Sequence, residues 1–209
     1  MHDQPWTVAP LVALDLEGSG SQDREHEAIL EVGIVPLADG RPDMQSAYDS
    51  VVNPGRRIPR RPWSSPGLTN DVLGLAPRLD AVEPELAGRL NGAAIVGHNV
   101  NVDWRLLSLR CPGIHPASLI DTLKLARLVH GNTQHRSLTA LLAYYGLDDE
   151  VTKLTGGQPH RALWDAVGAG LLLGALIREL PHGDSLTVTG LRNMAGVSLG
   201  DAEQTLPLF

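Results

Sequence analysis

The chain has 209 residues, of which 43% are hydrophobic and 20% are charged. These values are ordinary for one globular domain, and no apolar run reaches the roughly 18 residues that a membrane-spanning helix needs. The first residues lack the pattern of a signal peptide, and a single cysteine, Cys111, excludes an internal disulfide and a zinc site with paired thiolates. We therefore expect a cytoplasmic protein. The net charge of −7 argues against unspecific binding to nucleic acid but leaves local binding open.

Apolar and alternating segments near the start predict three successive strands, at residues 8–17, 28–37 and 46–53. Further along, helices and strands alternate: we expect helices at 79–91, 101–110, 121–130, 137–145 and 160–179, and strands at 93–97 and 118–120. This order predicts an α/β domain with a central mixed sheet flanked by helices. We expect that domain to span residues 1–180, followed by a linker and tail at 181–209.

Several residues in these elements have structural explanations. Asp121 and Ser137 each precede an expected helix and are typical N-caps. The last long helix carries three glycines, which predict close packing against a neighbouring element: Gly168, Gly170 and Gly174.

The sequence Asp-Leu-Glu ends the first apolar run. On a strand, Asp15 and Glu17 project from the same face, while Leu16 points into the core. Two adjacent carboxylates repel each other unless a cation joins them, and oxygen ligands of this kind suit Mg²⁺ or Mn²⁺. The alternative explanation for this pair alone is an exposed strand end.

Two further motifs follow expected elements. His98 and Asn99 end a strand, and Asp103 lies in the first turn of the next helix, where a carboxylate also stabilises the helix N-terminus. His160 and Asp165 are five residues apart around the start of the last long helix. Each motif by itself has an ordinary structural explanation.

Together, and in this order, the motifs resemble the DEDDh group of 3′→5′ exonucleases, the family of the DnaQ-like proofreading domains. The similar segments lie between residue 10 and about residue 178: LDLEGSG, ILEVGIVPL, VVNPG, PGLT, GHNVNVDWRLL, LIDTLKLAR and HRALWDA. The resemblance implies a ribonuclease H-like fold and the release of nucleoside 5′-monophosphates from a 3′ end. We expect a DNA substrate, in proofreading, repair or end trimming, with an exoribonuclease of the same superfamily as the alternative.

The resemblance also implies a role for each of five residues. Asp15, Glu17 and Asp165 would ligate one of two divalent cations, Mg²⁺ or Mn²⁺, and Asp15 would bridge to the second. Asp103 would support the second ion through water. His160 would be the general base, and a histidine is suited to take a proton near neutral pH.

Residues beside these motifs are expected to contact the substrate: Gly18, Ser19, His98, Asn99 and Trp104. Trp104 adjoins Asp103 and could stack on a base, although core packing is the use that we favour for a tryptophan at this position. The family usually has Thr at the position of Gly18, Phe at that of Val102 and His at that of Pro66, so the details of 3′-end binding depart from its pattern.

Two segments suggest contacts with partners. A basic group in the loop after the third strand fits either phosphate contacts or a solvated loop: Arg56, Arg57, Arg60 and Arg61. The last residues, QTLPLF, resemble a bacterial sliding-clamp-binding peptide, an extended segment that buries apolar anchors in a pocket: Gln204, Leu206, Leu208 and Phe209. The alternative is a tail that folds back on its own domain.

Two functions of other classes also fit parts of the sequence. Gly18 and Gly20 after a strand are typical of dinucleotide binding, but Asp23 occupies the position of the third glycine, and the acidic strand end would repel a pyrophosphate. A non-catalytic nucleic-acid or clamp-interaction module is the other alternative. The presence of all five expected catalytic residues argues against it.

Overall fold

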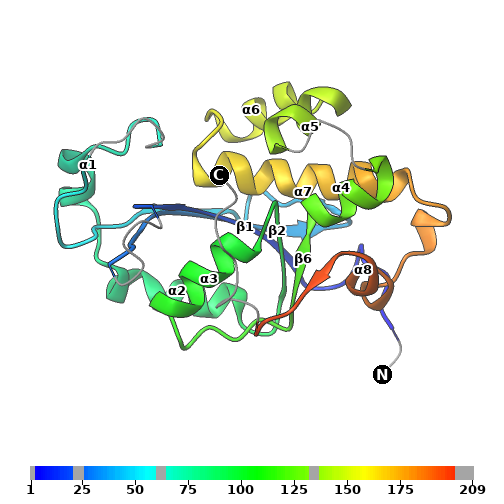
Figure 1. The fold of residues 1–209 in the computed structure, drawn as a ribbon, viewed down its shortest axis with the longest axis horizontal. Coiled ribbons are helices and arrows are strands. Elements are labelled where there is room, and N and C mark those ends of the chain that lie inside the picture. Colours follow the sequence, from blue (N-terminus) through cyan, green and yellow to red (C-terminus); the bar gives the residue numbers. More distant parts are fainter. Residues whose placement is uncertain (1–2, 21–25, 60–64, 132–136, 201–209) are drawn as a thin grey trace.

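The computed structural model describes residues 3–20, 26–59, 65–131 and 137–200. Within these ranges, seven strands form one sheet and eight α-helices flank it (Figure 1). The strands are β1 (Leu11–Gly18), β2 (Ile29–Ala38), β3 (Arg41–Pro42), β4 (Tyr48–Val51), β5 (Ala94–Gly97), β6 (Ser118–Asp121) and β7 (Gly196–Val197). The α-helices are α1 (Asn70–Leu75), α2 (Leu79–Leu90), α3 (Asn101–Arg110), α4 (Thr122–His130), α5 (Leu138–Tyr145), α6 (Asp148–Thr155), α7 (Ala162–Arg178) and α8 (Val188–Ala195), and a short 3₁₀ helix, η2, spans Gly183–Ser185.

The sheet is mixed, in the order β3-β2-β1-β5-β6-β7, with β4 also paired to β2. β1 and β2 are antiparallel, whereas β5 and β6 run parallel to β1. This arrangement confirms the predicted mixed sheet. It contradicts the dinucleotide-binding alternative, because the strand after β1 is its antiparallel neighbour and not the second strand of a parallel βαβ unit.

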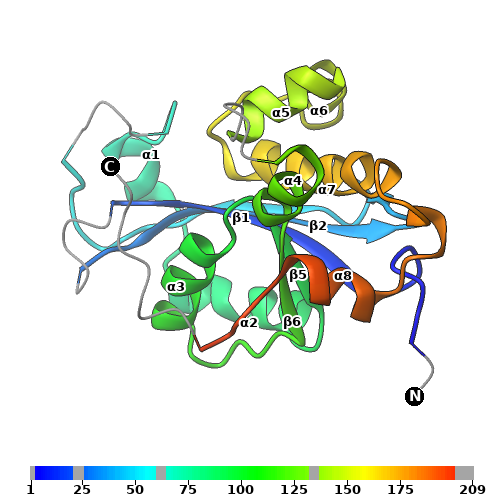
Figure 2. The same cartoon turned by 45° about the vertical axis from the view of Figure 1, so that its right-hand side comes forward.

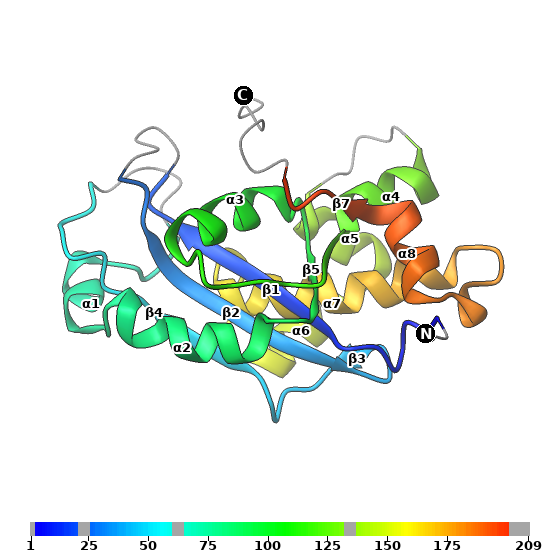
Figure 3. The same cartoon turned by 90° about the horizontal axis from the view of Figure 1, so that it is seen from below.

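Each face of the sheet has its own hydrophobic core. On one face, α7 lies along β1 and β2 and is covered in turn by α4, α5 and α6 (Figures 1 and 2). On the other, α2 and α3 cross β1 and β2 (Figure 3). Two helix glycines make the contacts of α7 possible: a Cβ at Gly168 would lie 2.8 Å from Leu142 Cδ1, and one at Gly170 would lie 2.9 Å from Leu37 Cδ2. The predicted close packing is confirmed at these two positions.

The sequence-based expectation of a linker after residue 180 is wrong for residues 188–197. Helix α8 packs on α4 and β6, and β7 pairs antiparallel with β6 at the edge of the sheet. Leu191 and Ala195, four residues apart, are fully buried, and Thr187 caps the helix by accepting a hydrogen bond from Gly190 N. This helix is short, so its apolar stripe is only two turns long and is easily read as irregular chain.

Helices α1 and α6 were not predicted either. Both are short, with six and eight residues, and lie next to segments rich in Gly and Pro. In the part of the chain that the structure describes, no helix has both the length and the apolar character needed to cross a membrane.

Candidate active site

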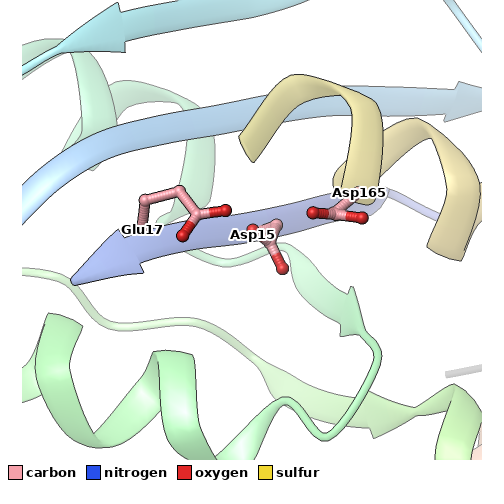
Figure 4. A group of neighbouring side chains, drawn as sticks. All are labelled: Asp15, Glu17 and Asp165. Carbon is pink, nitrogen blue, oxygen red and sulfur yellow. The ribbon is translucent and has the colours of Figure 1, made fainter. Parts of the chain in front are cut away.

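Three carboxylates from two elements converge at one end of β1. Asp15 and Glu17 come from β1 and Asp165 from the first turn of α7 (Figure 4). One oxygen of each lies within 4.8 Å of the others. The structure therefore brings together residues that are up to 150 positions apart in the sequence.

A glycine on β2 allows α7 to reach this position. Gly33 pairs with Asp15 in the β1–β2 ladder, and a Cβ on Gly33 would lie 2.2 Å from the carbonyl carbon of Ala162. Real Cβ contacts are not this short, so a side chain at Gly33 would force the start of α7 away from the sheet. The glycine thus places Asp165 beside Asp15.

Asp103 reaches the same site from α3. Along β1, only residues 11–13 pair with β5, so the backbone of β1 beyond Ala13 has no strand partner on that side. Leu16 N instead donates a hydrogen bond to Asp103 Oδ1 over 3.0 Å. The carboxylate of Asp103 completes the edge of the strand and lies close enough to Asp15 to raise the pKa of that residue.

Burial disfavours the charged forms of all four carboxylates, and the charges of neighbouring carboxylates add to this effect. Burial raises the pKa of Glu17 to about 7, of Asp103 to about 8 and of Asp165 to about 7. Burial, followed by the charges of the other three, raises the pKa of Asp15 well above its usual range. A divalent cation would remove this penalty, and a set of carboxylate oxygens is the donor set that Mg²⁺ or Mn²⁺ prefers.

His160 lies just before α7 in an uncommon backbone conformation. Its φ is +65°, and its backbone N–H donates to Asp165 Oδ2 over 3.0 Å. The side chain is exposed and close enough to Glu17 to lower the pKa of that carboxyl. A positive φ costs a non-glycine residue a small amount of conformational free energy. The hydrogen bond to Asp165 offsets this cost and fixes the backbone of His160 relative to the acidic cluster.

A partly buried ion pair that the sequence did not reveal holds the same segment in place. Glu31, only 2% exposed, lies opposite Glu17 in the β1–β2 register. It accepts hydrogen bonds from Arg161 Nε at 2.9 and 3.0 Å, from Arg161 Nη2, and from Ala162 N at 3.1 Å. This pair anchors the two residues between His160 and the body of α7. The available sequence signal was a lone carboxylate within the otherwise apolar ILEVGIV.

A pocket of about 270 Å³ opens beside Glu17. Gly18 and Ser19 line it, as do Arg57, Ser65 and residues 66–71. Ser65 donates a hydrogen bond to Glu17 Oε2, which joins the pocket to the acidic cluster. The structure thus places Gly18 and Ser19 where a group bound at the cluster could extend.

His98 and Asn99 follow β5 and are held by the start of α4. His98 Nδ1 lies 3.0 Å from Thr122 Oγ1, and Asn99 N donates to Asp121 Oδ1 over 2.8 Å. Asp121 also accepts from Leu123 N, which confirms its predicted role as N-cap. Ser137 caps α5 in the same way through Ala140 N.

Trp104 occupies a different environment from the one expected of a base-stacking residue. It is 6% exposed, packs in the core between α3 and the sheet, and donates from Nε1 to Leu199 O over 3.0 Å. This burial contradicts the expectation that Trp104 contacts substrate. Trp104 comes directly after Asp103 in α3, but its side chain packs in the core. Arg60, Arg61 and the tail residues Gln204, Leu206, Leu208 and Phe209 lie outside the described residues.

The sequence is similar to one protein family and to several bacterial proteins. A family model described as exonuclease matches residues 12–171. The chain is 34% identical over 171 residues to a PolC-type DNA polymerase III of Thermotoga petrophila, covering 79% of this chain and 12% of that protein. It is 25% identical over 205 residues to the 3′-5′ exonuclease DinG of Bacillus subtilis, covering 95% and 21%. The chain thus corresponds to a small part of these longer relatives.

Solved structures show the same fold. Exonuclease X in complex with 5′ overhanging duplex DNA matches with a TM-score of 0.65 at 24% identity, over 88% of this chain and 98% of that one. The nuclease domain of 3′hExo, a DEDDh family member bound to rAMP, matches with a TM-score of 0.66 at 16% identity, over the same shares. The chain therefore belongs to the exonuclease family and has the ribonuclease H-like fold of the solved exonucleases.

Proposed function

We propose that this protein is a metal-dependent exonuclease that hydrolyses DNA from the 3′ end and releases nucleoside 5′-monophosphates. The observation that carries this proposal is the meeting of Asp15, Glu17 and Asp165 within 4.8 Å, with Asp103 beside them. Two divalent cations bound there would stabilise the negative charge that develops on the scissile phosphate and on the entering and leaving oxygens. Without a cation, the same four carboxylates are costly to ionise together.

Each carboxylate has a role that its position supports. Asp15, central among the carboxylates, would ligate both ions, while Glu17 and Asp165 would complete the shell of the first. Asp103, which accepts a hydrogen bond from Leu16 N, would support the second ion through water. These assignments follow the family resemblance.

His160 would act as general base. An imidazole nitrogen takes a proton from the attacking water while the water oxygen bonds to phosphorus and the 3′ oxygen of the preceding nucleotide leaves. Its exposed side chain can reach a bound water, and the backbone hydrogen bond to Asp165 ties it to the metal-binding carboxylates. General-base catalysis by a positioned side chain is typically worth about 10²–10⁴ in rate.

DNA is preferred over RNA in this proposal because the relatives similar in sequence include PolC-type DNA polymerase III proteins. RNA is the second candidate, since one structural neighbour recognises the 3′ end of a histone mRNA stem-loop. The chemistry of the acidic cluster is the same for both.

The test is digestion of 5′-labelled DNA and RNA strands of identical sequence, with Mn²⁺ or Mg²⁺ present. We expect a ladder that shortens from the 3′ end, faster for DNA, and no ladder with Asp15→Asn. Full activity of Asp15→Asn would overturn the site assignment. Faster digestion of RNA would overturn the substrate assignment alone.

We also propose that the segment at residues 204–209 binds a sliding clamp. Support comes from its sequence, in which Gln204 is followed by the apolar residues Leu206, Leu208 and Phe209. Immobilised clamp should retain the wild-type chain, and Leu208→Ala with Phe209→Ala should abolish retention while leaving digestion of short strands unchanged. Equal retention of the doubly substituted chain would contradict this proposal.

A further inference from the structure

A second pocket, of about 380 Å³, adjoins the candidate active site. Its walls come from the start of β2, the loop after β4, the start of α2 and the last residue of α3. The two pockets meet at Ser19 and Ala28: Ser19 lines the first and Ala28 the second, and the two residues exchange hydrogen bonds of 2.9 Å. Consecutive residues of the loop after β4 also divide between them, with Arg57 in the first and Arg56 in the second.

The second pocket is positively charged on a chain whose net charge is −7. Three arginines line it: Arg56, Arg78 and Arg110. Of the two carboxylates among the described residues of its wall, Glu27 is buried in an ion pair with Arg105, with 2.6 Å between Oε2 and Nη2, and Asp80 is the other. His26 also lines the pocket.

Backbone contacts hold the basic groups in place. Arg56 donates to His26 O over 2.7 Å, and Arg110 Nε donates to Glu27 O over 2.6 Å. Arg78 packs against the loop after β4: a Cβ at Gly55 would lie 2.8 Å from Arg78 Nη1. A hydrogen bond from Asn53 N to Pro77 O joins the same loop to the residue before Arg78. Because Arg56 bonds to a neutral carbonyl and Arg78 packs on a glycine, neither contact cancels the charge of the guanidinium.

The start of α2 adds to the positive potential. Arg78 is the N-cap residue of this 12-residue helix and forms no side-chain capping hydrogen bond. The first N–H groups of a helix and its dipole attract anions, and arginine matches the oxygens of a phosphate in paired hydrogen bonds. The pocket therefore combines two independent features that favour a phosphate group.

We propose that this pocket binds a backbone phosphate of the nucleic acid substrate beyond its 3′-terminal nucleotide. The proposal rests on the proposed exonuclease function and extends it, because a strand whose terminal nucleotide lies at the acidic cluster can continue past Ser19 and Ala28 into the second pocket. The pocket then contributes affinity for polymeric substrate and none for a single nucleotide.

The test is the salt dependence of strand binding, measured by fluorescence anisotropy with labelled single-stranded and duplex DNA. Every chain carries Asp165→Asn, so that the DNA stays intact. Each of Arg56→Gln and Arg78→Gln should weaken binding and reduce the slope of log K against log salt by about 0.7 to 0.9, the value for one lost phosphate contact. Arg41→Gln is the matched control, since Arg41 is exposed and paired with Glu150 on another part of the surface. Slopes equal to that of the control would overturn the proposal.

A second measurement separates this proposal from the proposed function. The p-nitrophenyl ester of thymidine 5′-monophosphate has no backbone beyond one nucleotide, so Arg78→Gln in the otherwise unchanged chain should hydrolyse it at the wild-type rate while its KM for a long strand rises. If the wild-type chain hydrolysed no strand, the proposed exonuclease function would be wrong. The slopes of log K against log salt would still test whether the pocket contacts a phosphate. A slope unchanged by Arg78→Gln, combined with loss of inorganic phosphate binding in that variant, would identify a small-anion site instead and overturn the proposal.

Discussion

The acidic cluster and the basic pocket lie on adjoining parts of the molecule, yet they are built on opposite principles. The cluster places four carboxylates close together in a largely buried position. Ionising all four costs free energy unless cations are bound. The basic pocket holds two of its three arginines, Arg56 and Arg78, at exposed positions, where the charge of each guanidinium remains hydrated and costs little. We therefore expect single substitutions in the cluster to have large effects on chemistry, and those in the pocket to have small effects on binding.

The largest effect is expected for Asp165→Asn. Loss of one ligand removes several kcal/mol of transition-state stabilisation, which corresponds to a fall in release rate of about 1,000-fold or more. The measurement is nucleotide release from a labelled strand at saturating Mn²⁺. In chelator, the same variant should melt at a higher temperature than wild type, because Asp165 no longer repels Asp15. A lower melting temperature would contradict repulsion among these carboxylates.

His160→Gln should lower the release rate by about 100-fold, less than loss of a metal ligand, because water can still lose its proton to solvent. Binding of Mn²⁺ should be unchanged, since the hydrogen bond to Asp165 comes from the backbone of residue 160. The rate is checked by single-turnover digestion and the affinity by calorimetry. A tenfold loss of Mn²⁺ affinity would show that the histidine is a ligand and not the base.

Breaking the Glu31–Arg161 pair should affect both stability and rate. Arg161→Leu leaves the buried Glu31 without its partner, and we expect a loss of about 2 kcal/mol in the free energy of unfolding, below the value for a fully buried pair because Arg161 is 34% exposed. Release should also slow, by about tenfold, because residues 160–162 lose their anchor.

Arg105→Leu provides the matched control for this substitution. It breaks the similar Glu27–Arg105 pair, which joins α3 to the segment before β2 and not to residues 160–162. Urea unfolding should show a comparable loss of stability, while kcat on the mononucleotide ester stays near wild type. An equal fall in kcat for both variants would show that instability alone explains the effect of Arg161→Leu.

The stability of the metal-free protein should fall as pH rises. Glu17, Asp103 and Asp165 have folded-state pKa values raised to about 7 or 8, so the folded chain binds more protons than the unfolded chain between pH 4 and 8. Stability is then fully present below about pH 4 and is lost as pH rises through 7, by several kcal/mol, since each unit of pKa difference corresponds to about 1.4 kcal/mol. Urea unfolding in chelator at pH 5 and pH 8 measures this, and saturating Mn²⁺ should abolish the difference. Greater stability at pH 8 in chelator would contradict it.

The sequence was informative where a residue's surroundings are local or where a motif is short and ordered. Buried runs such as LVAL and AAIVG predicted their strands, and Asp121 was identified as a cap because an N-cap bonds to residues two or three positions on. The four carboxylates and His160 were found because each lies in a short motif of a known family, and the structure brings all five together.

Features that depend on distant residues could not be predicted in this way. Glu31 and Arg161 are 130 positions apart, and nothing local distinguishes Arg161 from a solvated arginine. The basic pocket joins Arg56 to Arg78 and Arg110, of which only Arg56 stood out in the sequence as part of a basic group. Trp104 was misassigned because its neighbour Asp103 turns to the acidic cluster while the tryptophan turns to the core.

The most direct test of the central proposal, a two-cation centre formed by four carboxylates, is the number of Mn²⁺ ions bound per chain with a nucleoside 5′-monophosphate present. Electron paramagnetic resonance should report two ions with the spin coupling expected of a close pair, and Asp15→Asn should remove that coupling, since Asp15 is the proposed bridge. A wild-type protein that binds one isolated ion, or none, while still releasing nucleotides would contradict the account.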